Sequence, residues 1–414
     1  MTQETRALGR LLVFFDEPYF RTERDGQEVV TTNRAFWLFV RALAPAFSHV
    51  DFLARIAPER REAPFSCTPD PHFTLRELPY YESLYDLGGL LRVLPAQLRV
   101  FWEAIGACDA VLLGIPHPAC LVLWAIARLR GRRVLFLDRQ DLIARAKLRA
   151  PGAGRSAIVF GAWLLVRAFV LLSRSTLTFA VGEEMRRRYA HPGAPAHGLL
   201  ISLVREKDLS GVSARSLPPA SAPKRLLWVG RVDPDKGLEV LLEAFRSVTA
   251  ARPGEQWHLD LVGTGLIEAQ IARQVEDLGL ARSAHLHGFV PFGPELNAYY
   301  DSATAYVLPS NESEGFPQVL IEAMARGLPL IATAVAGIPY VLRDGENAVL
   351  LPPRNPEALA AAILRMLGDA DLYHRCSEAG LRFAGEHTLE AQTRKFLDAA
   401  SPYLRREPSA AYGR

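Results

Sequence analysis

Residues 305–339 read AYVLPSNESEGFPQVLIEAMARGLPLIATAVAGIP, and this stretch decides the fold. It opens with a short apolar run at 306–308 that is typical of a buried strand, and Pro309 breaks the run. A polar loop follows, and an apolar pattern with helical spacing then covers 319–325. A second apolar run at 328–332 completes a strand–loop–helix–strand unit of a parallel sheet.

Two carboxylates belong to this unit. Glu314 lies in the loop, and Glu322 follows it by eight residues, two turns into the expected helix. Loops at the carboxyl ends of strands are where open α/β sheets bind ligands. Both carboxylates can therefore face one crevice at the end of the sheet.

Strands and helices alternate along the rest of the chain. A polar stretch at 16–33 separates the first strand from a helix expected over 34–47. The alternation predicts an α/β fold with two Rossmann-like, doubly wound parallel-sheet domains that face each other across a cleft. The apolar runs of strand type are 11–15, 49–56, 73–78, 110–115, 133–137, 177–181, 225–229, 257–262, 285–287, 306–308, 328–332 and 348–351.

A change of composition marks the boundary between the expected domains. Residues 210–224 read SGVSARSLPPASAPK, without any apolar period. This is typical of a linker that proline stiffens. We expect a first α/β domain over 1–208, a linker over 209–224 and a second α/β domain over 225–385. The last helix and tail, 386–414, are expected to pack back toward the first domain.

Charge is spread unevenly along the 414 residues, of which 49% are hydrophobic and 22% charged. The net charge is only +3, but residues 101–200 hold 14 Lys and Arg against 6 Asp and Glu, a difference of +8. One interpretation is a solvated basic face, and the other is a surface for anionic lipid or a phosphate-bearing acceptor. Nucleic acid is not expected as a partner, because no recognition motif accompanies the charge.

Cysteine spacing and the apolar segments indicate the cellular compartment of the protein. Four cysteines without C-x-x-C spacing indicate a reducing compartment and no metal cluster. The first residues lack a signal-peptide pattern. Gly161 and Arg167 interrupt the long apolar stretch at 157–172, so a buried or interfacial helix is favoured over a membrane span. We expect a cytoplasmic protein that can sit at the inner face of a membrane.

The stretch from Gly230 to Gly237 carries two cations, Arg231 and Lys236, in one strand-to-helix loop. Glycines let backbone amides approach a diphosphate, and the cations neutralise its charge. The alternative is a tight loop with solvated charges. Asp233 and Asp235 form a D-x-D pair, but the neighbouring lysine argues against a metal, and a turn explains the two acids better.

Gly263-Thr264-Gly265 follows another expected strand and resembles the start of a dinucleotide-binding fingerprint. The third glycine position holds Glu268, so the sequence does not match the G-x-G-x-x-G motif. A tight strand-to-helix turn is the favoured interpretation.

Two cations and two carboxylates in one α/β half suit a nucleotide sugar, because carboxylates accept hydrogen bonds from vicinal hydroxyls and cations stabilise a leaving diphosphate. The pairing of G-R-x-x-x-x-K-G with E-G-F-P-x-x-x-x-E-A-M-A-x-G-x-P resembles the family 4 (group 1) retaining glycosyltransferases of the GT-B fold. The resemblance is specific over 226–351 and only architectural over 1–210.

The resemblance implies a retaining transfer from a nucleotide diphosphate sugar, with no metal or other cofactor. It implies that Arg231 and Lys236 hold the leaving diphosphate, that Glu322 binds ribose and that Glu314 holds the donor sugar. The diphosphate itself is expected to accept the acceptor's proton. The remaining donor-binding residues that it implies are Gly230, Val290, Gly315, Phe316 and Val319.

The first half departs from the family's pattern. Gln140-Asp141-Leu142 stands where a His-Asp-Leu is usual, directly after Arg139. His117 follows a strand end and either faces the cleft or is a satisfied loop residue. We assign the acceptor or sugar side to His117, Arg139, Gln140 and Asp141.

The sequence thus predicts a hexosyltransferase that takes a UDP- or GDP-linked sugar to a glycan or lipid-linked acceptor. Its partners would be the donor, the acceptor and an anionic membrane surface. One alternative is a nucleotide-sugar epimerase of the same fold. Another is a catalytically silent module that binds a sugar nucleotide.

Overall fold

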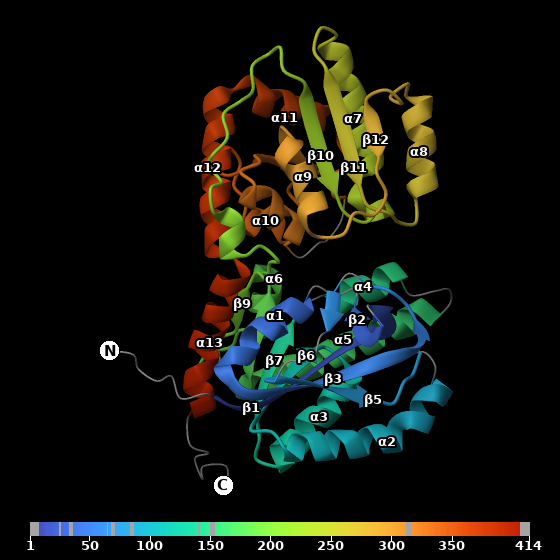
Figure 1. Ribbon diagram of the computed structural model, residues 1–414, viewed down its shortest axis with the longest axis vertical. Coiled ribbons are helices and arrows are strands. Elements are labelled where there is room, and N and C mark those ends of the chain that lie inside the picture. The colour runs from blue at the N-terminus through green and yellow to red at the C-terminus, as the bar shows by residue number, and fades with distance from the viewer. Residues whose placement is uncertain are drawn as a thin grey trace. The chain divides into compact units, whose positions relative to one another are not determined.

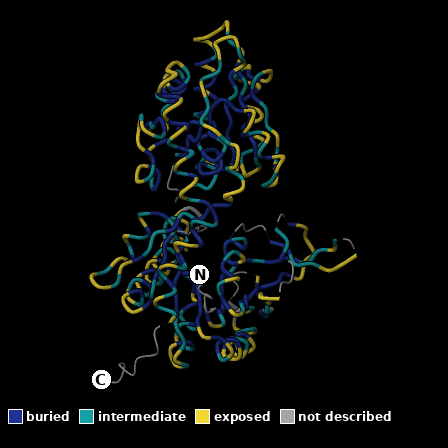
Figure 2. The backbone as a smooth tube through the Cα atoms, turned by 60° about the vertical axis from the view of Figure 1, so that its left-hand side comes forward, coloured by how far each residue is buried: buried dark blue, intermediate teal, exposed yellow. Residues whose placement is uncertain are grey.

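The computed structural model describes residues 8–24, 26–32, 36–63, 65–67, 71–82, 87–139, 141–149, 154–311 and 316–405. The chain divides into two compact units, each a layered α/β structure (Figure 1). The first unit holds the chain up to Ile201 and again from Gln392, and the second holds Ser202–Ala391. In Figure 2 the buried segments run through the interior of each unit.

Nine strands of the described chain form the sheet of the first unit, and most of them are parallel. The parallel strands lie in the order β5–β3–β1–β6–β7–β8–β9. Two further strands extend the sheet antiparallel, with β2 beside β1 and β4 beside β2. The strands are β1 (Leu8–Arg24), β2 (Gln27–Thr32), β3 (Phe47–Arg60), β4 (Phe65–Cys67), β5 (Phe73–Leu78), β6 (Ala110–Ile115), β7 (Arg133–Asp138), β8 (Leu177–Val181) and β9 (His197–Leu199).

Strand β1 is longer than the sequence indicates. Residues 11–14 pair with β6, and residues 20–24 then pair with β2 in a hairpin that takes up most of the polar stretch 16–33. Tyr19 and Phe20 are buried, and the Tyr19 ring packs against Trp37 and Phe52. These buried rings carry the strand past the polar pair at 16–17, which is why the stretch is a strand and not a loop.

Seven helices that include described residues belong to the first unit, and their apolar faces build its core around Phe14, Phe101 and Phe136. Phe396 from the end of the chain packs against Phe39 and Phe179, which fixes the last helix on this unit. The helices are α1 (Phe36–Leu43), α2 (Leu87–Gly106), α3 (Pro118–Leu129), α4 (Leu142–Arg149), α5 (Arg155–Leu172), α6 (Glu183–Tyr189) and α13 (Leu389–Arg405).

The second unit has a six-stranded parallel sheet in the order β12–β11–β10–β13–β14–β15. The order reverses between β10 and β13, and this switch point is where such sheets bind ligands. The strands are β10 (Lys224–Val229), β11 (Trp257–Val262), β12 (Ala284–Leu286), β13 (Ala305–Leu308), β14 (Leu330–Thr333) and β15 (Val349–Leu351). The helices are α7 (Leu238–Ala251), α8 (Glu268–Asp277), α9 (Pro294–Ser302), α10 (Gln318–Ala325), α11 (Pro356–Gly368) and α12 (Ala370–Glu386).

Two doubly wound parallel sheets confirm the predicted fold class. The chain passes between the units at residues 201–202 and 391–392. The stretch 209–224, expected as a linker, lies within the second unit, and the Arg215 amide donates a hydrogen bond of 2.8 Å to Ser377 Oγ on α12.

Candidate functional site

Four loops meet at the carboxyl ends of β10, β11, β12 and β13. The Gly230 amide donates to the Val262 carbonyl at 3.0 Å, and the Gly263 amide donates to the Gly288 carbonyl at 2.7 Å. The Asn311 amide donates to the Asp235 carbonyl at 2.8 Å. These backbone hydrogen bonds hold the loop with the two cations beside the loop that leads to α10.

Two glycines make this close approach feasible. Gly237 has φ +68°, and a Cβ there would lie 2.0 Å from the Pro309 carbonyl oxygen. Gly263 has φ +136°, and a Cβ there would lie 1.8 Å from the Gly230 carbonyl oxygen. Only glycine fits both the backbone and the space. The packing of loops therefore explains Gly263 without a dinucleotide.

Arg231 and Lys236 each have an acidic partner within their own loop. Arg231 pairs with Asp233, and Lys236 Nζ lies 3.0 Å from Asp235 Oδ2 in the short 3-10 turn η5 (Pro234–Lys236). The Arg231 side chain is 59% exposed and that of Lys236 is 12% exposed. Asp233 also accepts a hydrogen bond from the Leu266 amide at 3.3 Å. An anionic ligand would thus meet cations that the loop already positions.

The two acids of this loop act as partners of its cations. Within the described ranges, no three or more His, Cys, Asp or Glu side chains form a group that could hold a metal ion. The D-x-D pair accordingly has a structural explanation in the turn.

Glu322 is buried in the second turn of α10. Its Oε2 accepts a hydrogen bond of 2.9 Å from the Tyr300 hydroxyl on α9. Burial raises the pKa of Glu322 to about 7, although the Tyr300 hydroxyl favours the charged form. Glu322 therefore changes charge near neutral pH, and a ligand whose hydroxyls donate to it would favour the carboxylate.

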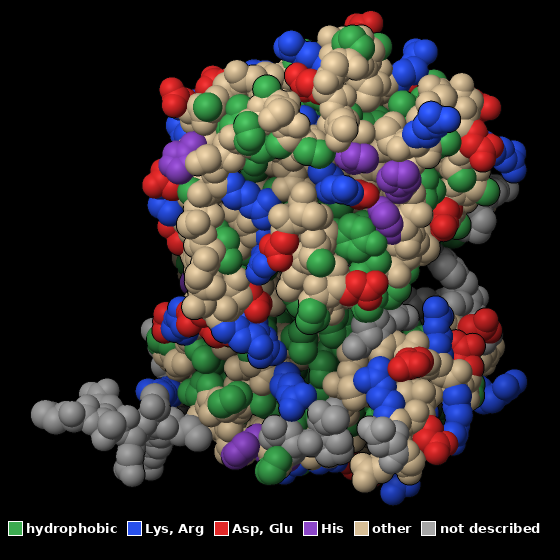
Figure 3. All heavy atoms as spheres, turned by 45° about the horizontal axis from the view of Figure 1, so that its top comes forward, with side chains coloured by type: hydrophobic (Ala, Val, Ile, Leu, Met, Phe, Trp, Pro, Cys, Tyr) green, Lys and Arg blue, Asp and Glu red, His purple; other side chains and the backbone are tan. Residues whose placement is uncertain are grey.

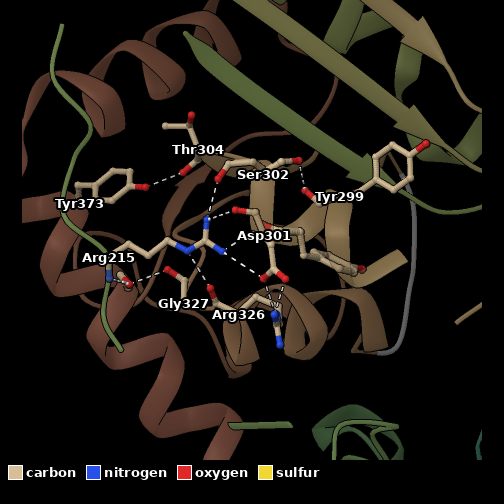
Figure 4. Close-up of polar contacts among 11 residues, drawn as sticks. Arg215, Tyr299, Asp301, Ser302, Thr304, Arg326, Gly327 and Tyr373 are labelled. Atoms are coloured by element: carbon tan, nitrogen blue, oxygen red, sulfur yellow. Dashed lines mark hydrogen bonds and ion pairs between the residues drawn. The ribbon is translucent and has the colours of Figure 1, made fainter. Parts of the chain in front are cut away.

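Arg215 holds the two helices that carry this pair together (Figure 4). Its Nη1 donates to the Ala303 carbonyl at 2.8 Å, its Nη2 to the Tyr300 carbonyl at 3.1 Å, and its Nε to the Arg326 carbonyl at 2.8 Å. These carbonyls end α9 and α10, where a positive charge is favourable. The half-buried guanidinium thus fixes the two helix ends against each other, next to Tyr300 and Glu322.

A second polar network fixes α9 on the sheet. Asp260 is buried on β11 and accepts hydrogen bonds from Arg225 Nη1 at 2.7 Å and from His287 Nε2 at 2.7 Å. The His287 ring lies 4.8 Å from that of Tyr299, the residue before Tyr300. Histidine side chains gather on one face in Figure 3. The register places His258 and His285 on the same side of the sheet as Asp260.

The other predicted donor-side residues differ in their surroundings. Val290 is buried, and Val319 is partly exposed in the first turn of α10. Phe316 is buried with its ring against Phe383 of α12, at a centroid distance of 5.9 Å. Glu314 and Gly315 lie outside the described residues.

In the first unit, His117 caps the N-terminus of α3. Its Nδ1 accepts a hydrogen bond of 3.2 Å from the Ala119 amide, and its Nε2 lies at ion-pair distance, 3.2 Å, from Asp16 Oδ2. Asp16 also accepts hydrogen bonds from Arg55 Nε at 3.0 Å and from the Tyr81 hydroxyl at 2.7 Å. Burial alone would raise the pKa of Asp16, but these three partners hold it well below its usual value.

Arg139 and Asp141 are also paired within the first unit. Arg139 pairs with Glu17, and its guanidinium lies 4.0 Å from the centre of the Phe36 ring. Asp141 caps α4 by accepting from the Ile143 amide at 2.9 Å, and it pairs with Arg188. Gln140 lies outside the described residues.

Sequence reasoning missed Asp16, Tyr300 and Arg215. The sequence contains a feature that could have identified Asp16, because this acid directly follows the first apolar run. The feature that points to Arg215 is weaker: it is the single arginine in a stretch rich in Ser, Pro and Ala. No sequence feature points to Tyr300, since a tyrosine in a short amphipathic helix is ordinary.

The second unit, which carries the loop of cations and Glu322, also matches a known family. Residues 223–369 match the model for glycosyl transferases, group 1. This chain contains a group 1 glycosyltransferase domain. The assignment confirms the resemblance that its motifs indicate.

Two curated relatives show the extent of the likeness. The chain is 34% identical over 302 residues to an exopolysaccharide phosphotransferase of Streptomyces coelicolor. This alignment covers 72% of this chain and 28% of the relative. It is 36% identical over 156 residues to an amylovoran biosynthesis glycosyltransferase of Erwinia amylovora. This alignment covers 36% of this chain and 38% of the relative. The chain thus spans between about a quarter and two fifths of these curated relatives.

Solved structures show the fold over nearly the whole chain. The Anabaena protein HepE, solved in complex with UDP and glucose, aligns with a TM-score of 0.62 at 16% identity, covering 95% of this chain and 99% of HepE. HepE and the other glycosyltransferases that align in this way have the GT-B fold, and this chain shares it.

Proposed function

We propose that this protein is a retaining glycosyltransferase that moves a hexose from a UDP- or GDP-linked donor to a glycan or lipid-linked acceptor, without a bound metal or other cofactor. The observation that carries the proposal is the position of Arg231, Lys236 and Glu322. All three lie in loops or helices at the switch point of the second sheet, inside the domain that matches the family.

The chemistry follows from the charges at this site. Arg231 and Lys236 bind the donor diphosphate and stabilise the negative charge that it gains as its bond to the sugar breaks. Glu322 accepts hydrogen bonds from the ribose hydroxyls, and Glu314 accepts them from the sugar. The acceptor hydroxyl attacks the same face of the sugar, and its proton passes to an oxygen of the departing diphosphate. No side chain is needed as a general base.

In this proposal the acceptor binds to the first unit. His117, Arg139 and Asp141 lie at the carboxyl ends of β6 and β7, where ligands of such sheets bind. Two of the relatives are named for exopolysaccharide and amylovoran chemistry. These names support a glycan or a lipid-linked glycan as acceptor.

We place the reaction in the cytoplasm, at the inner face of a membrane. All four cysteines are buried and unpaired, as is usual in a reducing compartment. The basic first unit supports contact with an anionic surface.

A panel of sugar nucleotides tests the donor. With EDTA present, UDP- or GDP-linked hexoses should raise the melting temperature, because a ligand that binds only the folded state stabilises it. NMR of the transfer product should show the anomeric configuration of the donor. Interconversion of the donor without an acceptor would indicate an epimerase, and binding without release of the diphosphate would indicate a silent module. No stabilisation by any donor would overturn the proposal.

A further inference from the structure

Helix α5 exposes an apolar face. Its buried side chains form one stripe at Ala162, Val166 and Phe169, which pack into the first unit. Large apolar side chains on the rest of the helix are exposed to solvent: Phe160, Trp163, Leu164 and Leu171. In the described part of the chain, Arg155–Ser175 is the one helical segment long and apolar enough to cross a membrane, and 22% of it is buried.

Aromatic and basic side chains are combined on this face. The rings of Phe160 and Trp163 are stacked, with centroids 5.9 Å apart and planes 15° apart. The guanidinium of Arg167 lies 5.3 Å from the centre of the Trp163 ring. Tryptophan and arginine side chains have an apolar body and a polar end, so they suit the boundary between acyl chains and headgroups.

The charge around α5 has one sign. The sequence contains no Asp or Glu between residues 142 and 182, and its basic residues there are Arg145, Lys147, Arg149, Arg155, Arg167 and Arg174. The arginines of α6 differ, because Arg186 and Arg187 pair with Glu183. The excess of positive charge is therefore concentrated along α4 and α5, which pack on each other (Figure 1).

The buried stripe restricts the orientations in which α5 can bind a membrane. Ala162, Val166 and Phe169 are buried, and Phe169 belongs to the core of the first unit, so the helix cannot cross a bilayer without disrupting that unit. A helix with one face in a protein core and an apolar, basic face outside lies flat in the interface. We propose that α5 docks on an anionic bilayer, with Phe160, Trp163 and Leu164 among the lipids and its arginines on their phosphates.

This inference deepens the proposed function, because it names the surface on which a lipid-linked acceptor would be met. It rests on that function only for the acceptor, since docking on lipid needs no transfer.

Helix α2 provides a matched control in the same unit. It exposes Leu91, Leu98 and Trp102, and the guanidinium of Arg130 lies 4.2 Å from the centre of the Trp102 ring. Trp102 is 49% exposed and Trp163 is 42% exposed. The two tryptophans differ in charge environment, because Glu103 follows Trp102 and no acid lies near Trp163 in sequence.

The test is co-sedimentation of the full chain with vesicles of phosphatidylcholine, with and without phosphatidylglycerol. The protein should bind the anionic vesicles at low salt and release them as salt rises, because salt screens surface charge. Trp163→Asp should weaken binding by about tenfold or more. Trp102→Asp should leave it unchanged.

The arginines are tested in the same assay. Arg167→Ser with Arg174→Ser should weaken binding by about fivefold for each arginine removed. Arg92→Ser with Arg99→Ser, on α2, is the control with equal loss of charge and should have less effect. Circular dichroism and thermal unfolding check that every variant folds.

Three results would overturn the inference: no binding to anionic vesicles at low salt, equal loss in the Trp163 and Trp102 variants, or equal loss in the two arginine pairs. Stabilisation by sugar nucleotides, measured on the same samples, separates the two proposals. If it persists while vesicle binding is absent, only the docking of α5 fails.

Discussion

The carboxyl ends of the two sheets carry opposite arrangements of charge. In the second unit, Arg231 and Lys236 pair with acids of their own loop, and the Arg231 side chain is largely exposed. In the first unit, Asp16 is nearly buried beneath His117, Arg55 and Tyr81, which come from other segments of the chain.

This difference shows which side is arranged to receive a charged ligand. Replacing the acidic partner of an exposed cation such as Arg231 by a diphosphate costs little free energy, because that partner lies in the same short loop. Removing one of the three partners of Asp16 costs much more, because a charge in a protein interior needs compensation. We therefore expect the second unit to bind the ionic part of the donor and the Asp16 cluster to stabilise the first unit.

Replacing Lys236 should have the largest effect on activity. Lys236→Ala removes a charge that stabilises the leaving diphosphate, and turnover should fall by a factor of about 10²–10³. Arg246→Ala, an exposed arginine on α7, is the control and should keep wild-type turnover. Steady-state kinetics with the donor identified by the panel measure both. Wild-type turnover in the Lys236 variant would remove the assigned role.

Replacing Asp16 should affect stability instead. Asp16→Ala leaves Arg55 buried without its carboxylate and should lower the free energy of unfolding by about 3 kcal/mol. Chemical denaturation measures the change, and Asp398→Ala, an exposed acid on α13, is the control.

The effect of pH on the Asp16 cluster has a definite sign. The pKa of Asp16 is lowered in the folded state, so its stabilisation is present above its usual pKa near 3.8 and is lost as pH falls below that value. Asp16→Ala should therefore lose more stability at neutral pH than in acid. Equal losses at both pH values would contradict the role given to this carboxylate.

Replacing Glu322 should have a smaller and pH-dependent effect on donor binding. Its pKa is raised from 4.5 to about 7, so the wild type should bind the donor less tightly as pH falls below about 7. Glu322→Gln should raise the donor KM by about tenfold, the loss expected for a hydrogen bond to a charged group. Its KM should also stay constant across this pH range. A pH-dependent KM in the variant would assign the titration to another group.

The same residue gives a stability prediction of opposite sign to that of Asp16. Because the folded pKa is raised, wild-type stability should decline as pH rises from about 4.5 through about 7. Glu322→Gln should therefore make the ligand-free protein more stable above pH 7, by about 3 kcal/mol at most. Thermal unfolding at two pH values measures this.

Arg215 should show the smallest effect on the donor. Arg215→Ala releases the ends of α9 and α10 and should raise the donor KM by about threefold to tenfold with little change in kcat, the range for one lost hydrogen-bonding group. Arg215→Lys keeps the charge and should recover part of the affinity. Equal KM values in the wild type and Arg215→Ala would show that Arg215 only stabilises the unit.

The positions in the fold of the residues proposed for the donor side could be predicted, because their signals are local in the sequence. Gly230, Arg231, Lys236 and Gly237 lie in one loop, and strand–loop–helix periodicity places Glu322 on α10. Both sheets were predictable from the alternation of apolar runs. The extension of β1 was not, because the burial of Tyr19 and Phe20 depends on Trp37 and Phe52.

The supports of the site could not be predicted, because they depend on contacts between distant residues. Arg215 and the Tyr300 carbonyl are 85 residues apart, and Asp16 lies on β1 whereas His117 caps α3. A pattern along the chain contains no information about such pairs. The residues assigned to the acceptor side, where the sequence departs from the family's motif, stay predictions.

Calorimetric titration of UDP and GDP, with EDTA present, into the wild type, Lys236→Ala and Asp16→Ala tests the central claim most directly. We predict that the wild type binds one of the two nucleotides, that Asp16→Ala binds it equally well while folded, and that Lys236→Ala binds it much more weakly. Equal affinity in the wild type and Lys236→Ala, or loss of affinity in the folded Asp16→Ala protein alone, would contradict the account.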